Sequence, residues 1–440
     1  MSAIMLAPAL CPGASYQFAE ELFPELGHLI ELAAREGTEL QLNELRMEER
    51  SGELDVARGQ RRPQVHARAR LAGAYETRDD IGDRYRGSVN ANLTVTQPLY
   101  HWGALEGREV IAEDRVALQG LESSRHGERH FMEIRKAYLQ WLLMKQRKEL
   151  LEQSISLSES FVQARRQLVE VGQSSEQDVL EMEARLLENH ESLSYIEKRV
   201  GDIEGIMARL IGPGFSPVNL QGMPLSVIKP MSQSDLESLA ARVRSGQSGI
   251  ESPETEWFSL LESIESQNLA ILRKENHPKV DFVAGVLSDQ LDGLNDEDFA
   301  LRVQYYAGVQ INWNVFNGWQ TKGHKRSVLA RKRAFALQEK AAREDSGRRA
   351  GAILAELQLN LRQIEAREKR ADILERRQNL VREQVDRSLL PGSERIEVEI
   401  DYRDVRQRLM DARVNYIINL MELGILMGED PAQSLYRTES

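Results

Sequence analysis

Two pairs of segments in the chain alternate between apolar and polar residues over ten or more positions, which is typical of β-strands with one apolar and one polar face. The first pair spans 64–76 and 88–99, and the second spans 279–288 and 304–316. In the segment 88–99 the apolar positions are Val89, Ala91, Leu93 and Val95. The connections within each pair are polar and acidic, so we expect two β-hairpins with solvated loops.

A narrow stripe of apolar residues, spaced alternately by three and four, follows each strand pair and predicts helices that pack as coiled coils. The first stripe covers 104–211 and is broken by a turn near Gly172, and the second covers 319–427 and is broken near Pro391. A helix from 104 to 171 would be roughly 100 Å long at about 1.5 Å per residue. The turns near Gly172 and Pro391 are so short that the two helices on either side of each turn can form only an antiparallel hairpin.

The chain is a duplication of one structural unit. Four pairs of equivalent residues lie 215 positions apart, namely Leu54 and Leu269, Pro63 and Pro278, Val65 and Val280, and Gly103 and Gly318. Four landmarks at one spacing indicate an internal repeat. We therefore divide the chain into an N-terminal segment 1–25, a first repeat 26–212, a linker 213–235, a second repeat 236–428 and a C-terminal tail 429–440. Each repeat is predicted to contain a helix, two strands and a helical hairpin.

Composition narrows the class of protein. Hydrophobic residues make up 41% of the 440 residues and charged residues 29%, which is too charged for a helical membrane protein and too apolar for a disordered chain. No stretch has the roughly 18 consecutive apolar residues of a membrane-spanning helix. The 57 basic and 69 acidic residues give a net charge of −12, so we expect no nucleic-acid partner.

The single cysteine, Cys11, excludes an internal disulfide framework and a cysteine-based zinc site. It lies in an apolar segment that resembles a secretory signal without its basic start, which makes 1–25 a candidate truncated export signal. Leu10 is bulky for the position before a lipidated cysteine, which argues against lipidation of Cys11 but leaves it open.

No catalytic, cofactor-binding or metal-binding residues are predicted. The chain contains no P-loop, dinucleotide fingerprint, nucleophile elbow or HExxH pattern. His126 and His130 lie four residues apart on a predicted helix, a spacing that can hold a metal, but the sequence places no third ligand beside them. We therefore expect a protein that is not an enzyme and that has no cofactor.

The four predicted strands are long enough to cross a bilayer as a tilted sheet. A sheet in lipid must close on itself, and known membrane barrels have at least about eight strands. The chain therefore oligomerises, with two or three copies contributing strands, or its sheet is not in a membrane. Aromatic residues at the strand–helix joints fit the interfacial belt of a membrane protein, or else plug the joints of a soluble one. They are Tyr100, Trp102, Phe316 and Trp319.

The order of these elements, together with three short motifs, resembles the TolC-type outer-membrane efflux protein family over residues 26–428. The motifs are the strand end Gln97-Pro98-Leu99-Tyr100-x-x-Gly103, the hairpin tip Val171-Gly172, and Asp178-Val179-Leu180 after that tip. The resemblance implies a mainly α-helical homotrimer whose transmembrane β-strands form a shared 12-stranded β-barrel in outer-membrane lipid, continued by an α-helical tunnel through the periplasm. It also implies a passive exit duct of a tripartite efflux pump or type I secretion system, docked on a periplasmic adaptor protein and an inner-membrane pump.

The resemblance further implies two sets of functional residues. A periplasmic gate would be lined by Glu397, Ile400, Asp401 and Asp178. Glu397 aligns with Asp178, and three such carboxylates around one axis would form a cation-selective constriction, although acids near a helix start are also favoured by the helix dipole alone. The adaptor-contact tips would be Val171, Gly172, Gln173 and Ser174, and Leu390, Pro391, Gly392 and Ser393. At these tips, glycine can equally serve only to end a helix.

The sequence leaves a second class of function open, a soluble or periplasmic coiled-coil scaffold whose strands form a small packed sheet. An outer-membrane duct would require detergent, whereas a scaffold would not. The transported substrate is not indicated, because the lumen of such a duct would be generically polar.

Overall fold

The computed structural model describes residues 17–78, 82–171, 175–246, 253–292, 299–387, 389 and 392–435. The chain divides into two compact units, of which unit 1 comprises residues 1–44, 122–253 and 342–439 and unit 2 comprises residues 45–121 and 254–341. Each sequence repeat contributes to both units, because the long helices α4 (Ala104–Glu170) and α8 (Gln320–Asp386) begin in unit 2 and end in unit 1.

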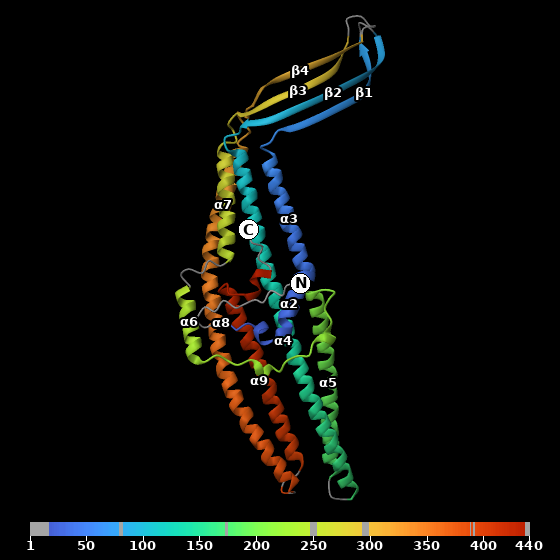
Figure 1. The fold of residues 1–440 in the computed structure, drawn as a ribbon, viewed down its shortest axis with the longest axis vertical. Helices are drawn as coiled ribbons and strands as arrows, with labels where there is room; N and C mark the ends of the chain where they lie inside the picture. Colours follow the sequence, from blue (N-terminus) through green and yellow to red (C-terminus); the bar gives the residue numbers. More distant parts are fainter. Residues whose placement is uncertain are drawn as a thin grey trace, which may run out of the picture. The chain divides into compact units, whose positions relative to one another are not determined.

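Unit 2 is built around one sheet of four antiparallel strands in the order β1-β2-β3-β4 (Figure 1). The strands are β1 (Gln64–Arg78), β2 (Gly82–Tyr100), β3 (Lys279–Asp292) and β4 (Phe299–Asn312). Unit 2 also contains most of α3 (Thr38–Gly59) and α7 (Pro253–Arg273), as well as the first parts of α4 and α8. Ile111 and Leu118 of α4 form a small buried cluster with Ile264 of α7, which holds these two helices together.

The strand register places apolar residues from all four strands on one face of the sheet. One row across that face consists of Val65, Val95, Ala284 and Ala307, and the next consists of Ala67, Leu93, Val286 and Tyr305. The row between them consists of His66, Thr94, Gly285 and Tyr306, and its side chains belong to the opposite face. Because side chains alternate along a strand, this register gives the sheet one apolar face and one mainly polar face.

The fourth strand ends at Asn312, although the alternation of apolar and polar residues continues to 316. Asn312 pairs with Lys279, the first residue of β3, so the residues that follow have no neighbouring strand to pair with. Residues 313–317 accordingly have no regular secondary structure. Alternation alone therefore places this strand too late in the chain, since the observed strand begins at Phe299 and ends at Asn312 and the predicted one spans 304–316.

Both strand–helix junctions contain two consecutive residues of positive φ. Trp102 (57°) and Gly103 (77°) form the first pair, and Gly318 (64°) and Trp319 (70°) form the second. A positive φ is unfavourable for a side chain as bulky as Trp. The two repeats thus keep the same unusual backbone turn even though the order of Gly and Trp is exchanged.

The described part of unit 1 is helical. It contains α1 (Ala19–Leu22), α2 (Pro24–Glu36), α5 (Glu176–Ile211), α6 (Gln233–Gly246), α9 (Gly392–Leu426), the remaining parts of α4 and α8, and the short 3-10 helices η1 (Pro217–Asn219), η2 (Leu225–Val227) and η3 (Pro431–Leu435). Its core includes Trp141 and Tyr138 of α4, whose rings stack at 6.0 Å between centroids, and Phe23, which meets Tyr138 edge-on at 5.8 Å.

A fully buried arginine of α4, Arg135, lies beside this core and joins the two ends of the described chain. Its Nε and Nη2 atoms donate hydrogen bonds to the Glu20 carboxylate at 3.1 and 2.5 Å. Its Nη1 and Nη2 atoms donate to the Asp430 carboxylate at 3.2 and 2.7 Å. Burial alone lowers the pKa of Arg135, but its pairing with Asp430 and Glu20 outweighs burial and raises that pKa above its usual value. The guanidinium therefore stays charged at every accessible pH.

Across the described ranges, no helix has both the length and the apolar composition needed to cross a lipid bilayer.

Candidate functional site

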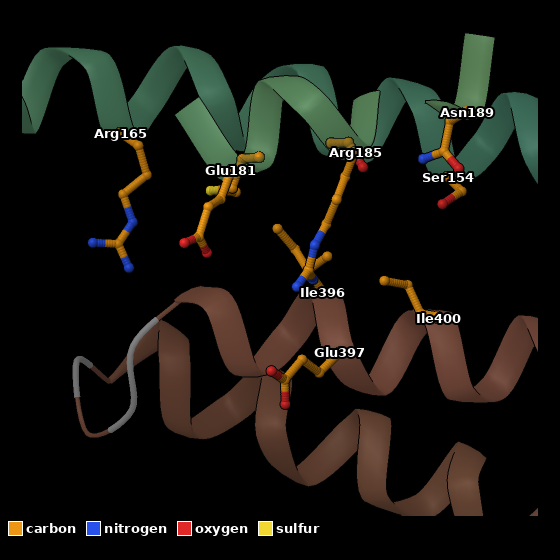
Figure 2. Close-up of a pocket in the computed structure, with 10 residues that line it drawn as sticks. Ser154, Arg165, Glu181, Arg185, Asn189, Ile396, Glu397 and Ile400 are labelled. Atoms are coloured by element: carbon orange, nitrogen blue, oxygen red, sulfur yellow. The ribbon is translucent and has the colours of Figure 1, made fainter. Parts of the chain in front are cut away.

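The predicted gate residues lie on the two helical hairpins of unit 1, α4–α5 and α8–α9. Ile396, Glu397 and Ile400, in the first turns of α9, line a groove of about 180 Å³ that faces α4 and α5. The other residues that line it are Ser154, Ser158 and Arg165 of α4, and Glu181, Met182, Arg185 and Asn189 of α5 (Figure 2). The structure thus brings Glu397 and Ile400 together at one groove, as residues one helical turn apart.

The side chains in the groove point in different directions. Figure 2 shows Glu181 and Arg185 extending from α5 toward α9, and Ile400 extending from α9 toward them, whereas the Glu397 side chain runs along α9. Glu397 is exposed, whereas the next residue, Val398, is fully buried. Successive residues of a helix point in different directions, so one can face solvent while the next faces the core. Within the described ranges, no hydrogen bond or ion pair of the Glu397 carboxylate is present.

The remaining two predicted gate residues do not join this groove. Asp401 forms an exposed ion pair with Arg377 of α8 at 3.7 Å, so it faces its own hairpin. Asp178 lies in the first turn of α5, and its side chain is outside the described residues. The groove itself contains two acidic and two basic side chains, so in a single chain it is not an acidic site.

Sequence reasoning missed Glu181, which lines the groove opposite Glu397. Glu181 follows Asp178 by three residues, and residues three apart share a helix face. Its carboxylate accepts a hydrogen bond from the Gln177 amide nitrogen at 3.5 Å. Arg185, one turn further along α5, was also missed. Asp178, Glu181 and Arg185 have the i, i+3, i+7 spacing of residues on one helix face, and this spacing could have identified the two missed residues from the sequence.

Polar contacts connect the two hairpins further from their tips. Arg147 of α4 donates two hydrogen bonds to the Asp411 carboxylate of α9, at 2.5 and 2.7 Å, and Arg403 of α9 donates one to the Ser154 hydroxyl of α4 at 2.9 Å. The Arg147–Asp411 pair is partly exposed, with side-chain exposures of 26% and 35%. Exposed and partly exposed ion pairs are typically worth about 0–1 kcal/mol. These contacts therefore hold the hairpins together without locking them.

The hairpin tips are described only in part. Gly172, Gln173, Ser174, Leu390 and Pro391 lie outside the described residues, as do the side chains of Gly392 and Ser393, which begin α9. Val171 is exposed at 66%, and Leu389, which sequence reasoning missed, is exposed at 68%. Ser175 caps α5, since its hydroxyl accepts a hydrogen bond from the Gln177 backbone nitrogen. Each tip thus presents at least one exposed aliphatic side chain.

The aromatic residues at the strand–helix junctions of unit 2 fall into two groups. Tyr100, Phe316 and Trp319 are more than half exposed. Trp102 is instead half-buried, and its indole nitrogen donates a hydrogen bond to the Pro278 carbonyl at 2.8 Å. Trp102 therefore also fills the junction, the alternative role considered from the sequence. Trp313, exposed at 61%, is a further aromatic residue of this region that sequence reasoning did not assign.

In the described ranges no three His, Cys, Asp or Glu side chains gather in a way that could hold a metal ion. His130 is buried in α4, and the centroid of its imidazole ring lies 6.1 Å from that of the Phe131 ring.

Comparison with known proteins relates this fold to outer-membrane channels. Residues 29–211 match the outer membrane efflux protein family. No curated protein sequence matches the chain. Among solved structures, the CmeC outer membrane channel of Campylobacter jejuni is 10% identical with a TM-score of 0.76, covering 100% of this chain and 92% of that one.

Two further structures have the same fold. The open state of the MtrE outer membrane channel of Neisseria gonorrhoeae is 16% identical with a TM-score of 0.75, covering 95% of this chain and 91% of that one. The outer membrane protein VceC of Vibrio cholerae is 16% identical with a TM-score of 0.72, covering 92% and 96%. At such identities the likeness establishes the fold.

The predicted fold class is confirmed as mainly helical with one small sheet. The prediction that the chain is not an enzyme agrees with the family match, since that family consists of efflux proteins. The resemblance to the TolC-type outer-membrane efflux proteins is thereby confirmed, because the chain matches that family over residues 29–211 and has the fold of outer-membrane channels over nearly its whole length.

Proposed function

We propose that this chain is one subunit of a passive outer-membrane efflux channel that extends into the periplasm. Three copies would join their four-stranded sheets into one 12-stranded barrel in outer-membrane lipid, and their helical hairpins into a tunnel. The chain would perform no catalytic step. It would serve a tripartite efflux pump or a type I secretion system, together with a periplasmic adaptor and an inner-membrane pump.

The apolar face of the sheet is the observation that carries this proposal. Large apolar side chains on this face are exposed in the isolated chain, including Val65 at 62%, Tyr305 at 77% and Val309 at 62%. A soluble monomer rarely exposes a contiguous apolar patch of this kind. A membrane barrel requires it, because its strands alternate apolar residues toward lipid with polar residues toward the lumen.

The two edges of the sheet support an oligomeric channel. β1 and β4 each pair on one side only, so each presents a row of free backbone groups. In lipid these groups must be paired, which requires a closed barrel. Pairing β4 of one copy with β1 of the next would continue the antiparallel order, and three copies give a barrel within the known size range. The likeness to outer-membrane channels supports the same assembly.

Glu397 is the residue proposed for the periplasmic gate. It is exposed, is not engaged by another described residue, and lies one turn from Ile400 in the groove. Three copies around the tunnel axis would form a ring of carboxylates, which favours cations over anions. Asp401, which pairs with Arg377, and Asp178 would contribute to the same acidic region.

Conductance of the purified protein in planar bilayers tests the gate, with Glu397→Ala compared to Glu399→Ala. Glu399 is the matched control because it is an acidic residue two positions away that hydrogen-bonds Gln378 of its own hairpin. The preference for cations should fall in the Glu397 variant and persist in the Glu399 variant. Equal selectivity of both variants and the wild-type protein would remove Glu397 from the gate.

Contact of the hairpin tips with an adaptor is proposed from the exposed Val171 and Leu389 beside the two turns. Replacing either with Asp should weaken co-purification with a periplasmic adaptor protein co-expressed with the chain, while leaving conductance intact. Undiminished co-purification of the double variant would exclude the tips as the contact.

Membrane fractionation tests the function as a whole. A channel subunit should fractionate with outer membranes, need detergent for extraction and have the mass of a trimer in detergent. A monomer that stays soluble without detergent would refute the channel and favour the coiled-coil scaffold.

A further inference from the structure

The mainly polar face of the sheet carries unbalanced positive charge on its first strand. Arg68 and Arg70 of β1 are exposed and belong to this face, together with His66. Their partners across the sheet are all neutral, since His66 pairs with Thr94, Arg68 with Asn92 and Arg70 with Asn90. The two arginines lie two residues apart, about 7 Å along the strand.

Other described side chains of this face do not neutralise the arginine pair. Among the strand residues whose side chains the structure describes, Asp281 of β3 is the acidic residue on this face. Its carboxylate accepts hydrogen bonds from His101 at 2.7 Å and from Asn312 at 3.3 Å. Arg68 lies in one row with Leu287 of β3, and Asp281 is six residues from Leu287 along that strand. The Asp281 carboxylate is therefore about 20 Å from Arg68. Arg302 of β4 also belongs to this face and pairs in register with Asp289.

The arginine pair contrasts with the charge of the whole chain. The net charge is −12, yet the β2 residues that pair with or lie next to the arginines, Asn90, Asn92 and Thr94, are uncharged. On β4 this face carries the uncharged Gln304 and Tyr306 and a further arginine, Arg302. Two like charges at neighbouring positions of one strand face repel each other. An anionic solute beside the two arginines would offset this repulsion, so the pair favours the passage or binding of anions.

We propose that Arg68 and Arg70 form an arginine ring in the barrel lumen that favours anionic solutes, such as those with carboxylate or phosphate groups. This inference rests on the proposed channel, in which the polar face lines the lumen. Three copies would place six guanidinium groups at two adjacent levels of the barrel. Rings of Arg or Lys are how pores select anions and phosphates, and guanidinium matches the geometry of both groups with two parallel hydrogen bonds.

The size of the barrel makes the ring effective. Twelve strands about 4.8 Å apart and tilted by about 40° give a barrel about 24 Å across. Arginine side chains that point inward would then bring their charge within about 10 Å of the axis, which is about one Debye length at 0.1 M salt. The effect should therefore reach solutes in the middle of the lumen and strengthen as the salt concentration falls.

The test is the reversal potential of the purified full-length protein in planar bilayers under a KCl gradient. Arg68→Gln/Arg70→Gln is compared with Arg68→Lys/Arg70→Lys, which keeps both charges. We expect the ratio of chloride to potassium permeability to fall at least about twofold in the Gln variant, since a change of one kT in lumen potential alters local ion concentrations about 2.7-fold. The Lys variant should keep the wild-type ratio, and the loss should be larger in dilute salt.

The possible outcomes separate this inference from the proposed function. Pores with the same permeability ratio in both variants and the wild type, at high and low salt, would overturn the arginine ring and leave the channel standing. Wild-type protein that forms no pores would refute the channel itself. Trimer mass in detergent, measured for each variant, shows that the altered chains have folded.

Discussion

The buried Arg135 gives the sharpest prediction about what stabilises unit 1. Arg135→Met replaces a fully buried guanidinium with an apolar side chain of similar length. The change leaves two carboxylates, Glu20 with 14% and Asp430 with 3% side-chain exposure, facing one position without their shared cation. Four hydrogen bonds to Arg135 are lost at the same time.

The expected loss of stability follows from this geometry. Removing one partner of a buried ion pair typically costs about 3–5 kcal/mol, because the remaining charge stays buried without its counter-ion. For domains of 150–250 residues, each kcal/mol lowers the melting temperature by about 2–4 °C. Arg135→Met should therefore lower the temperature at which unit 1 loses its helical signal by about 6–20 °C.

The assay is thermal unfolding of the purified protein followed by far-ultraviolet circular dichroism, with Lys136→Met as the matched control. Lys136 is the next residue of α4 and pairs with Glu422 at 2.6 Å, but its side chain is 40% exposed. Partly exposed pairs contribute about 0–1 kcal/mol, so the control should melt within a few degrees of the wild type. Equal melting temperatures of the Arg135→Met and Lys136→Met variants would show that the buried Arg135 network contributes no more to stability than the exposed Lys136–Glu422 pair.

Two further variants test the sheet and the pH dependence of unit 1. A Cβ on Gly285 would lie 2.6 Å from the Tyr306 hydroxyl, whereas a Cβ on Gly308 would meet nothing within 4 Å. Gly285→Ala should therefore lower the free energy of unfolding by about 1–3 kcal/mol in denaturant titrations. An equal loss with Gly308→Ala would contradict this expectation. Burial and the nearby Glu25 carboxylate raise the pKa of Tyr138. The folded state then binds this proton more tightly than the unfolded state, so the stability from this group is complete below about pH 10 and is lost at higher pH. Tyr138→Phe should lessen the fall in the free energy of unfolding between about pH 10 and 12, and an identical fall in both proteins would exclude Tyr138 as its source.

The sheet could be predicted from the sequence because its signal is local. Alternation with a period of two, at segments such as 88–99, needs no knowledge of distant residues. The pairing of β2 with β3 could not be found in this way, since it joins Val95 to Ala284, which are 189 residues apart in the chain. The end of β4 at Asn312 was missed for the same reason, because it depends on where the neighbouring strand begins.

The candidate gate was predicted only where the resemblance supplied a position. Glu397 and Ile400 meet at one groove, but the residues opposite them, Glu181 and Arg185, come from another hairpin. Packing between helices depends on which faces meet, and 69 acidic residues offer too many candidates for composition to choose among. Arg135 illustrates the same limit, since its partners lie 115 and 295 residues away.

The Arg135 network also bears on the order in which the protein matures. Glu20 is made early and Asp430 late, so during synthesis the arginine first has one carboxylate available and only afterwards the second. A chain cut short before residue 430 would leave this cation half-neutralised in the middle of unit 1. The helices of such a truncated chain would then be less stable than those of the complete chain.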